Sequence, residues 1–326
     1  MNLLTGKRVL VTGGAGFIGS SICHDLLERD NEVICLDNFA TGKRKNIEDL
    51  LGNQQFRLID GDIRDMETCR KAVDGADVVL HQAALGSVPR SIADPATTNA
   101  VNINGFLNMI IATRDAGIKR FVYASSSSVY GDSPELPKVE ERTGKVLSPY
   151  AITKLVNEEY ARIFGNLYGM ETIGLRYFNV FGRRQDPNGP YAAVIPKFTM
   201  SFMKYESPVI NGDGSNSRDF TYIDNVVQAN NLAAAVENPA AYNQAYNVAC
   251  GDSVNLNEMT SMLRGYLAVH DPKIATVDPN HGPTRAGDIP HSMASIGKAV
   301  RLLGYKPRVL FSEGLGHAVE WYVNNL

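Results

Sequence analysis

The chain has 326 residues, of which 44% are hydrophobic and 21% are charged, and its formal net charge at pH 7 is −3. These proportions are those of ordinary globular proteins, so they argue against disorder, and the length suits one large α/β unit with or without a smaller partner. The small negative charge and the scattered Lys and Arg give no reason to expect a nucleic acid or a membrane as a partner.

Short apolar runs rich in β-branched residues recur through the first half of the chain, with helical patterns between them. Because these runs are continuous rather than alternating, they fit strands buried on both faces of a parallel sheet. The predicted strands are 8–11, 33–36, 56–59, 78–80, 121–124 and 172–176, and the predicted helices are 19–29, 66–73, 101–116 and 149–168. This alternation predicts an α/β fold with a doubly wound parallel sheet of the Rossmann type.

The first predicted strand leads into the glycine-rich segment VLVTGGAGFIGS, in which Gly13, Gly16 and Gly19 open a helix. Glycines there permit a tight turn and a close approach of the backbone to a pyrophosphate, which binds the free amides at the start of the helix. Asp37 ends the second predicted strand, at about the 20-residue distance expected of a ribose-binding carboxylate. Together these features indicate a dinucleotide site.

Asp37 also bears on which dinucleotide is bound. A carboxylate at this place accepts hydrogen bonds from both ribose hydroxyls and would repel a 2′-phosphate, which favours NAD over NADP. The nearby Lys43 and Arg44 weaken that preference, because either could meet a phosphate. After the third predicted strand, Asp62 and Ile63 are placed to contact adenine, although Asp62 could equally be a helix cap.

The helix predicted over 149–168 carries Tyr150 and Lys154 one turn apart on the same face. Ser148 and Pro149 suit the cap and the first position of that helix. A tyrosine, with a reference pKa near ~10, is a poor base at neutral pH unless a positive charge such as a lysine ammonium stabilises its phenolate. A Tyr and Lys at this spacing are usually an ordinary surface pair, but behind a dinucleotide loop they indicate proton transfer.

After about residue 177 the pattern changes, and Gly, Pro and Asn concentrate in 182–191 and 211–220. We therefore expect an NAD-binding Rossmann domain over 1–177 and a smaller α/β substrate-binding lobe over 178–326. A helical pattern near 222–236 predicts a helix that returns to pack on the first domain.

The four cysteines form no CxxC pair and no metal-binding pattern, which favours reduced, buried thiols and no metal site. The N-terminal segment lacks the features of a secretory signal. No apolar run approaches the ~20 residues that would span a bilayer. We expect a cytoplasmic protein.

The ordered motifs of the chain resemble the extended short-chain dehydrogenase/reductase family, and within it the nucleotide-sugar 4-epimerases. The resemblance covers nearly the whole length, through TGGAGFIGS, LDNFATGKRKN, GDIRD, HQAA, SSSSVYGD, SPYAITK, LRYFNVFG, RDFTYIDN and RAGDIPHS. It implies reversible C4 epimerisation of a UDP-hexose through a 4-keto intermediate. It also implies that NAD is tightly bound and is regenerated in each cycle, and that residues 178–326 bind the UDP-sugar.

The resemblance implies that Tyr150, Lys154 and Ser126 are catalytic, with Ser127 and Ser128 as neighbours that could share the role of Ser126 at the sugar hydroxyl. The cofactor-binding residues that it implies are Gly13, Gly16, Phe17, Ile18, Gly19, Asp37, Asn38, Thr41, Gly42, Asp62, Ile63, Gln82, Ala83, Tyr150, Lys154 and Tyr177. The substrate-binding residues that it implies are Ser87, Ser126, Ser127, Ser128, Asn179, Ala193, Val194, Lys197, Asn211, Arg218, Arg285, Asp288 and Ser292.

The segments LGSVPRSIADP and GRRQDPNGPYAAVIPKF resemble the branch that acts on N-acetylated UDP-hexoses. In the family the position of Ser292 bounds the 2-substituent of the sugar, and a serine leaves room for an acetamido group. The expected reaction is therefore the interconversion of UDP-GlcNAc and UDP-GalNAc. UDP-glucose and UDP-glucuronate stay open as substrates, since Arg90 or Arg183 could meet a carboxylate.

Two other readings are less favoured. The related dehydratases carry Thr-Asp-Glu where this chain has only serines, so dehydration is disfavoured, as is decarboxylation. A non-catalytic NAD-binding protein would not need Tyr150, Lys154 and Ser126 together. In the family a helix pair such as 101–116 and 149–168 often forms a homodimer contact, so a homodimer is expected.

Overall fold

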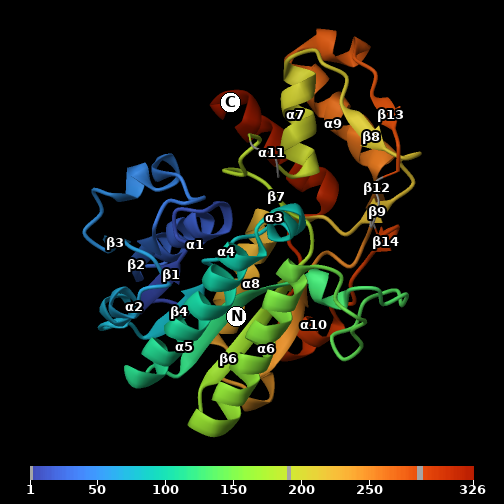
Figure 1. Cartoon of the computed structure of the whole chain (residues 1–326). Coiled ribbons are helices and arrows are strands. Elements are labelled where there is room, and N and C mark those ends of the chain that lie inside the picture. The colour runs from blue at the N-terminus through green and yellow to red at the C-terminus, as the bar shows by residue number, and fades with distance from the viewer. Residues whose placement is uncertain (1–2, 189–191, 285–288) are drawn as a thin grey trace.

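The core of the computed structural model is a seven-stranded parallel sheet (Figure 1). Its strands are β1 (Arg8–Thr12), β2 (Glu32–Asp37), β3 (Phe56–Asp60), β4 (Val78–His81), β5 (Arg120–Ser126), β6 (Glu171–Tyr177) and β11 (Gln244–Val248). They lie in the order β11-β6-β5-β4-β1-β2-β3, and six of them form the 3-2-1-4-5-6 arrangement of doubly wound dinucleotide-binding folds. The predicted fold class is confirmed. The structure describes residues 3–188, 192–284 and 289–326.

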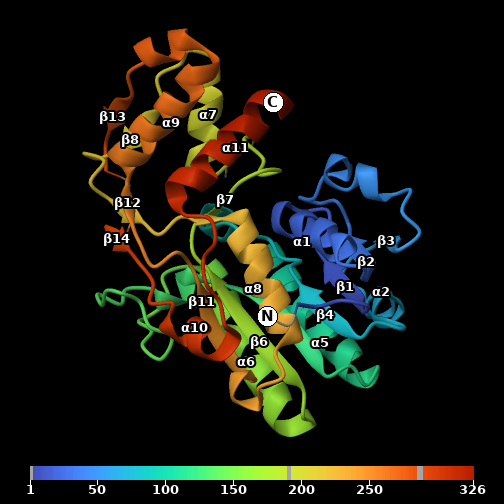
Figure 2. The same ribbon diagram turned by 180° about the vertical axis from the view of Figure 1, so that it is seen from behind.

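Helices cover both faces of the sheet, as the two opposite views show (Figures 1 and 2). One face carries α1 (Phe17–Glu28) and α8 (Ile223–Ala235), and the other carries α2 (Met66–Val73), α5 (Phe106–Asp115) and α6 (Pro149–Tyr168). Because successive strand residues point to opposite faces, Val9 and Val11 of β1 belong to the core under α1 and α8, whereas Leu10 belongs to the core under α2 and α5. Burial on both faces explains the continuous apolar runs.

The start of α6 is fixed locally. The Ser148 hydroxyl accepts a hydrogen bond from the Ala151 amide at 3.1 Å, and Pro149 occupies the first turn. Gly169 ends the helix with a left-handed φ of 67°, a conformation that glycine adopts without strain. The cap and first-turn roles predicted for Ser148 and Pro149 are confirmed.

The predicted helix over 101–116 has a more complex form. Two short helices precede it, namely α3 (Val88–Ala93) and α4 (Pro95–Asn99), and a π-helical segment, Ala100–Gly105, joins α4 to α5. The Ser87 hydroxyl caps α3, and the Asp94 carboxylate caps α4 before its proline. Each cap and proline starts a new helix. The chain before α5 therefore consists of α3, α4 and the π-helical segment rather than one regular helix.

The second lobe lies at the top of Figure 1 around α7, α9 and α11. Its helices are α7 (Val194–Met203), α9 (Leu256–His270) and α11 (Phe311–Asn325), and α10 (Gly297–Leu303) lies lower, near β11. Its short strands are β7 (Val180–Phe181), β8 (Val209–Asn211), β9 (Ser217–Arg218), β10 (Thr221–Tyr222), β12 (Val254–Asn255), β13 (Asn280–Gly282) and β14 (His291–Ser292). Single 3-10 turns occur at Arg44–Asn46, Glu48–Leu50, Ser127–Tyr130, Pro239–Ala241 and Pro272–Thr276.

Part of the later chain returns to the first lobe. The segment expected as a helix near 222–236 forms α8, and β11 then pairs in parallel with β6 at the edge of the sheet. We propose that the lobes divide near residue 177, with α8 and β11 returning to the first. Among the residues that the structure describes, no helix has the length and apolar character needed to cross a membrane.

Candidate active site

The glycine-rich turn between β1 and α1 is packed so closely that side chains would not fit. A Cβ on Gly13, whose φ is +67°, would lie 2.8 Å from the backbone of Ala83, and a Cβ on Gly19 would lie 2.1 Å from the carbonyl oxygen of Gly13. Gly16 is the N-cap of α1 and makes no side-chain cap. The start of α1 is thus bare backbone, which is the arrangement that binds a pyrophosphate.

Asp37 lies at the end of β2, buried beside this turn. Its carboxylate accepts hydrogen bonds from the amides of Ala15 at 2.9 Å and Phe39 at 2.8 Å. Burial raises the pKa of Asp37 above its ordinary value, while the backbone donors act in the opposite direction. Gly42 packs against this carboxylate, because a Cβ there would lie 2.8 Å from both of its oxygens.

The two basic residues that weakened the preference for NAD have acidic partners. Lys43 forms an ion pair with Asp186 at 2.7 Å, and Arg44 forms one with Asp60 at 2.9 Å. The Arg44 guanidinium also lies over the ring of Phe39, 4.4 Å from its centre. Both cations thus have carboxylate partners within the protein, which removes the objection that they raised to a preference for NAD.

Asp62 follows β3 and lies beside Asn38. Its carboxylate accepts hydrogen bonds from the Asn38 amide at 2.7 Å and from two nitrogens of the Arg64 side chain, and the Arg64 contact is the main cause of its low pKa of about 2. The N-cap of α2 is Asp65, which accepts from the amides of Glu67 and Thr68. The alternative that Asp62 caps this helix is therefore wrong.

A cavity of about 560 Å³ joins these groups to the carboxyl ends of the central strands. It is lined by fifteen of the sixteen residues expected to bind the cofactor, Gly42 being the exception. They are Gly13, Gly16, Phe17, Ile18, Gly19, Asp37, Asn38, Thr41, Asp62, Ile63, Gln82, Ala83, Tyr150, Lys154 and Tyr177.

Sequence reasoning missed several residues of the cavity wall, including Arg64, Ser125, Gln185, Asp186 and Asn188. Gln185, Asp186 and Asn188 come from the loop after β7, which the ion pair of Asp186 with Lys43 holds against the loop after β2. The signals in this region were the concentration of Gly, Pro and Asn in 182–191 and the resemblance of GRRQDPNGPYAAVIPKF to a substrate-specific branch of the family, and neither points to these three residues. Ser125 precedes Ser126 in the serine run, and nothing in the run separates the two.

Tyr150 and Lys154 line the cavity, and Ser126 interacts with the Tyr150 side chain. Burial raises the pKa of Tyr150, and the interaction of its side chain with the Ser126 hydroxyl opposes that change. The Lys154 ammonium donates to the Ala124 carbonyl at 2.8 Å and lies 5.9 Å from the centre of the Tyr150 ring. Burial lowers the pKa of Lys154 to about 8, and the Glu158 carboxylate opposes that change. A phenol, a hydroxyl and a cation are thus assembled for proton transfer.

Ser127 and Ser128, which follow Ser126 in the run, have other surroundings. Ser127 begins the 3-10 turn Ser127–Tyr130, whose N-cap is Ser126. The Ser128 hydroxyl is buried and is among the few buried side-chain atoms, in the part of the chain that the structure describes, with no hydrogen-bond partner. Of the serine run only Ser125 is among the residues that line the cavity, so Ser126, Ser127 and Ser128 do not differ in this respect.

In the second lobe, three of the expected substrate residues lie around the buried residue Asp219. The Asp219 carboxylate accepts hydrogen bonds from the amides of Cys250 at 2.9 Å, Gly251 at 3.0 Å and Ala294 at 3.2 Å, and burial raises its pKa to about 6. These bonds tie β9 to the ends of β11 and β14. The expected substrate residues that they place together are Asn179, whose amide donates to the Asp219 carbonyl, and the paired Arg218 and Ser292.

The remaining expected substrate residues are more dispersed. Ala193 lines the cavity and is the N-cap of α7, which contains Val194 and Lys197. Asn211 ends β8, and Ser87 caps α3 with a φ of 135°. Arg285 and Asp288 lie outside the residues that the structure describes.

The two arginines considered for a carboxylate differ in their surroundings. Arg90 lines the cavity. Arg183 forms an ion pair with Asp224 at 2.6 Å and donates to the Tyr222 hydroxyl. Of the two, Arg90 is the one placed on the cavity wall.

The model of the NAD dependent epimerase/dehydratase family matches residues 9–249. A UDP-glucose 4-epimerase from Mycolicibacterium smegmatis is 34% identical over 319 residues, which cover 97% of this chain and 99% of the relative. The structure of UDP-N-acetylglucosamine 4-epimerase from Methanobrevibacter ruminantium M1, in complex with UDP-N-acetylmuramic acid, is similar with a TM-score of 0.91, 39% identity and coverage of 99% and 100%. That of UDP-glucuronic acid 4-epimerase from Bacillus cereus, in complex with UDP-glucuronic acid and NAD, gives a TM-score of 0.88, 29% identity and coverage of 98% and 100%.

Proposed function

The chain belongs to the NAD dependent epimerase/dehydratase family, and from this we propose that it interconverts UDP-GlcNAc and UDP-GalNAc by inverting C4 of the hexose. More broadly, it is an NAD-dependent UDP-sugar 4-epimerase. The observation that carries the proposal is the contact of Tyr150 with Ser126, with Tyr150 and Lys154 on the wall of a cavity that suits a dinucleotide.

The cavity fits NAD on physical grounds. The glycine turn offers backbone amides at a distance that any side chain would prevent, and Asp37 presents a carboxylate where NADP would carry a phosphate. When bound, NAD accepts the hydride of the sugar carbon and returns it.

The residues of the site handle the proton. Tyr150 accepts the proton of the 4-hydroxyl while Ser126 hydrogen-bonds the same oxygen, and the Lys154 ammonium lowers the free energy of the phenolate form. The resulting 4-keto sugar turns over in the pocket and is reduced on its opposite face. Tyr150 then returns its proton to the new hydroxyl, so the net reaction consumes neither a proton nor a hydride.

The second lobe would hold the nucleotide while the hexose turns. Asn179 and Arg218 are assigned to the diphosphate, because an amide and a guanidinium are suitable donors to phosphate oxygens. Arg285 is assigned to the diphosphate as well, and Asp288 to a ribose hydroxyl or to an arginine. Val194, Lys197 and Asn211 are assigned to the nucleotide, while Ser87 and Ala193 are assigned to the acetamido side of the sugar.

A second candidate is UDP-glucuronate 4-epimerisation. It is favoured by the place of Arg90 on the cavity wall, where a guanidinium could pair with a sugar carboxylate. UDP-glucose is the third candidate, and it needs no charged partner for the sugar.

The test is to incubate the purified protein with each of the three UDP-sugars, without added cofactor, and to follow the products by ¹H NMR. We expect UDP-GalNAc from UDP-GlcNAc with the highest kcat/KM of the three pairs, and deuterium placed at C4 should return to the sugar. A dehydrated or decarboxylated product, or deuterium lost to solvent, would contradict the assignment.

Ser292 is proposed to set the room for the 2-substituent. Substituting Ser292→Tyr should reduce kcat/KM for UDP-GlcNAc by about 10- to 100-fold relative to UDP-glucose, because the phenol would occupy the place of the acetamido group. Ser261→Tyr on the exposed side of α9 is the control, and its two kcat/KM values should match those of the wild type. Equal losses for both sugars in Ser292→Tyr would refute the role.

We also propose a homodimer through α5 and α6. The outer face of α6 exposes Ile152, Ile163 and Leu167, with 49%, 39% and 68% of their surfaces accessible. Apolar side chains gathered on one helix are typical of a protein interface. A cytoplasmic location is proposed from the cysteines, which are all free and of which three are buried.

A further inference from the structure

Glu158 is a buried acid one helical turn beyond Lys154 on α6. Its carboxylate accepts a hydrogen bond from the Ser125 hydroxyl at 2.5 Å and two from Arg176, at 2.9 Å and 2.7 Å. The Glu158 and Arg176 side chains are only 10% and 6% exposed. Such a two-point contact between a guanidinium and a carboxylate fixes orientation as well as charge. The mechanism above makes no use of this group.

The contact with Ser125 reaches the centre of the site. On β5, Ser125 lies between Ala124, whose carbonyl accepts the Lys154 ammonium, and Ser126, which hydrogen-bonds Tyr150. Glu158 therefore joins α6, which carries Tyr150 and Lys154, to the stretch of β5 that carries the partners of both.

The charges near Lys154 come from four elements. Among the described residues, the titratable or charged groups next to Lys154 are Tyr150 and Glu158 on α6, His81 on β4 and Tyr177 on β6, and those next to Glu158 are Tyr123 on β5 and Arg176 on β6. Burial, with a smaller effect of Lys154, lowers the pKa of His81 to about 3, so His81 is neutral at pH 7. Burial raises the pKa of Tyr123 and of Tyr177, so they are neutral as well. Within this set Glu158 supplies the negative charge.

We propose that Glu158 is a positioning residue of the epimerase: its carboxylate, held by Arg176, fixes α6 against β5 through Ser125 and stabilises the buried Lys154 as an ammonium. The reaction needs this because a buried ammonium loses its hydration and reverts to a neutral amine unless a negative charge compensates. A neutral amine would leave the Tyr150 phenolate without its cation. The inference rests on the proposed acid–base role of Tyr150 and Lys154.

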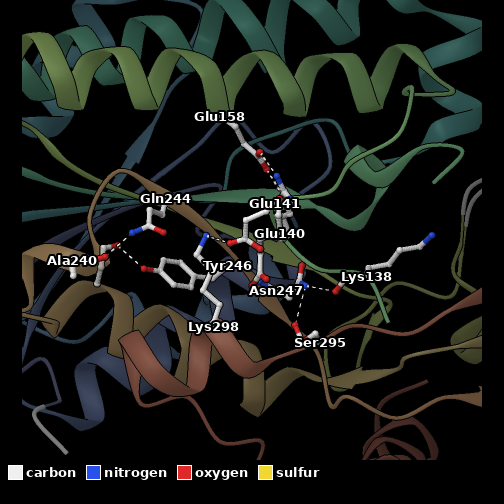
Figure 3. Close-up of polar contacts among 12 residues, drawn as sticks. Lys138, Glu140, Glu141, Glu158, Ala240, Gln244, Tyr246, Asn247, Ser295 and Lys298 are labelled. Carbon is white, nitrogen blue, oxygen red and sulfur yellow. Dashed lines mark hydrogen bonds and ion pairs between the residues drawn. The ribbon is translucent and has the colours of Figure 1, made fainter. Parts of the chain in front are cut away.

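Arg176 is anchored independently of Glu158. Its third nitrogen donates to the Glu140 carbonyl at 3.0 Å, and its guanidinium lies over the Tyr130 ring, 5.0 Å from the centre. Figure 3 shows Glu158 on one side of Glu140, and Asn247 of β11 on the other. The Glu140 carboxylate accepts a hydrogen bond from the backbone N–H of Asn247 at 2.9 Å. The side-chain amide of Asn247 donates to the carbonyls of Lys138 and Ser295. Arg176 therefore keeps its contacts with Glu140 and Tyr130 when Glu158 is changed, although it loses its ion-pair partner.

The experiment substitutes Glu158→Gln, which keeps the size and an acceptor for Ser125 but removes the charge. Lys154 is titrated in the NAD-loaded protein by ¹³C NMR of labelled lysine Cε, with its resonance assigned from Lys154→Met. We expect the Lys154 pKa to be lower in Glu158→Gln than in the wild type, because the stabilising anion is gone. The alkaline limb of the kcat profile should move to lower pH with it, giving about a tenfold loss of kcat at pH 9 and a smaller loss at pH 6.5.

Three variants separate charge from structure. Glu159→Gln makes the same change at the next residue, which is exposed and pairs with Arg162. In this variant the Lys154 pKa should equal that of the wild type. Ser125→Ala keeps the charge and loses the contact with β5, so kcat should fall equally at all pH values while Lys154 titrates normally. If the cation left by Glu158→Gln prevents folding, the double variant Glu158→Gln/Arg176→Gln removes both charges and should again lower the Lys154 pKa.

The proposal is overturned if folded, NAD-containing Glu158→Gln, or the double variant in its place, gives a Lys154 titration that superimposes on that of the wild type. The proposal is also overturned if kcat of Glu158→Gln is lower than that of the wild type by the same factor at every pH. A wild-type protein inactive on every UDP-sugar would contradict the proposed function instead. The NMR titration would still decide the electrostatic role of Glu158 in that case.

Discussion

Substituting Tyr150→Phe should reduce kcat for UDP-sugar epimerisation by about 10²- to 10⁴-fold, the usual contribution of a positioned acid–base group. The change removes one oxygen and keeps the ring, so the packing of α6 and the cavity wall should persist. Ser126 would lose its side-chain partner, but no buried charge would be left unpaired. The measurement is the initial rate of product formation by NMR, with bound NAD assayed in the same sample.

Tyr168→Phe is the matched control, because Tyr168 lies at the end of the same helix with half of its surface exposed. It should turn over at the wild-type rate. If Tyr150→Phe kept its NAD and also its full rate, proton transfer would have to be assigned to another group. That result would favour the reading in which the chain only binds NAD.

Substituting Gly19→Ala should remove most of the bound NAD. The new Cβ would lie 2.1 Å from the Gly13 carbonyl oxygen, 2.8 Å from the Gly13 carbonyl carbon and 2.9 Å from the Gly14 Cα. All three are backbone atoms, so the turn itself must move. Overpacking of this kind costs about 1–3 kcal/mol, and a displaced turn also loses its amides for the pyrophosphate. We expect about a tenfold or larger rise in the dissociation constant of NAD and a lower Tm.

The control is Gly52→Ala, where a Cβ meets nothing within 4 Å and φ is not left-handed. NAD content is measured after release by heat, and Tm by calorimetry with and without added NAD. Retention of NAD by Gly19→Ala at the level of Gly52→Ala would show that the glycine turn is not the pyrophosphate site.

The sequence predicts the first lobe well because its signals are local. A strand buried on both faces must be apolar at every buried position, as at 9–11 and 121–124, and a glycine turn or a Ser-Pro helix start is visible within a few residues. The same holds for the cofactor-binding set, which lies mostly at the ends of these strands.

Other features depend on contacts between distant parts of the chain. β11 was not predicted because Asn247 interrupts its apolar run, and the structure uses that side chain in a buried network with Tyr130, Lys138 and Ser295. The ion pair of Lys43 with Asp186 joins loops from different lobes. In the serine run, only the partner on another element distinguishes Ser125, bonded to Glu158, from its neighbours.

The late arrival of β11 has a consequence for biogenesis. As the chain is synthesised, the apolar surface that α8 covers stays bare until residues 223–235 have been made, and the outer edge of β6 stays bare until residues 244–248 have been made. An open strand edge invites pairing with other chains. The nucleotide-binding half therefore cannot mature before the chain has been synthesised well into the second lobe, to the end of β11 at Val248. A nascent chain arrested near residue 177 should need a chaperone to stay free of aggregates.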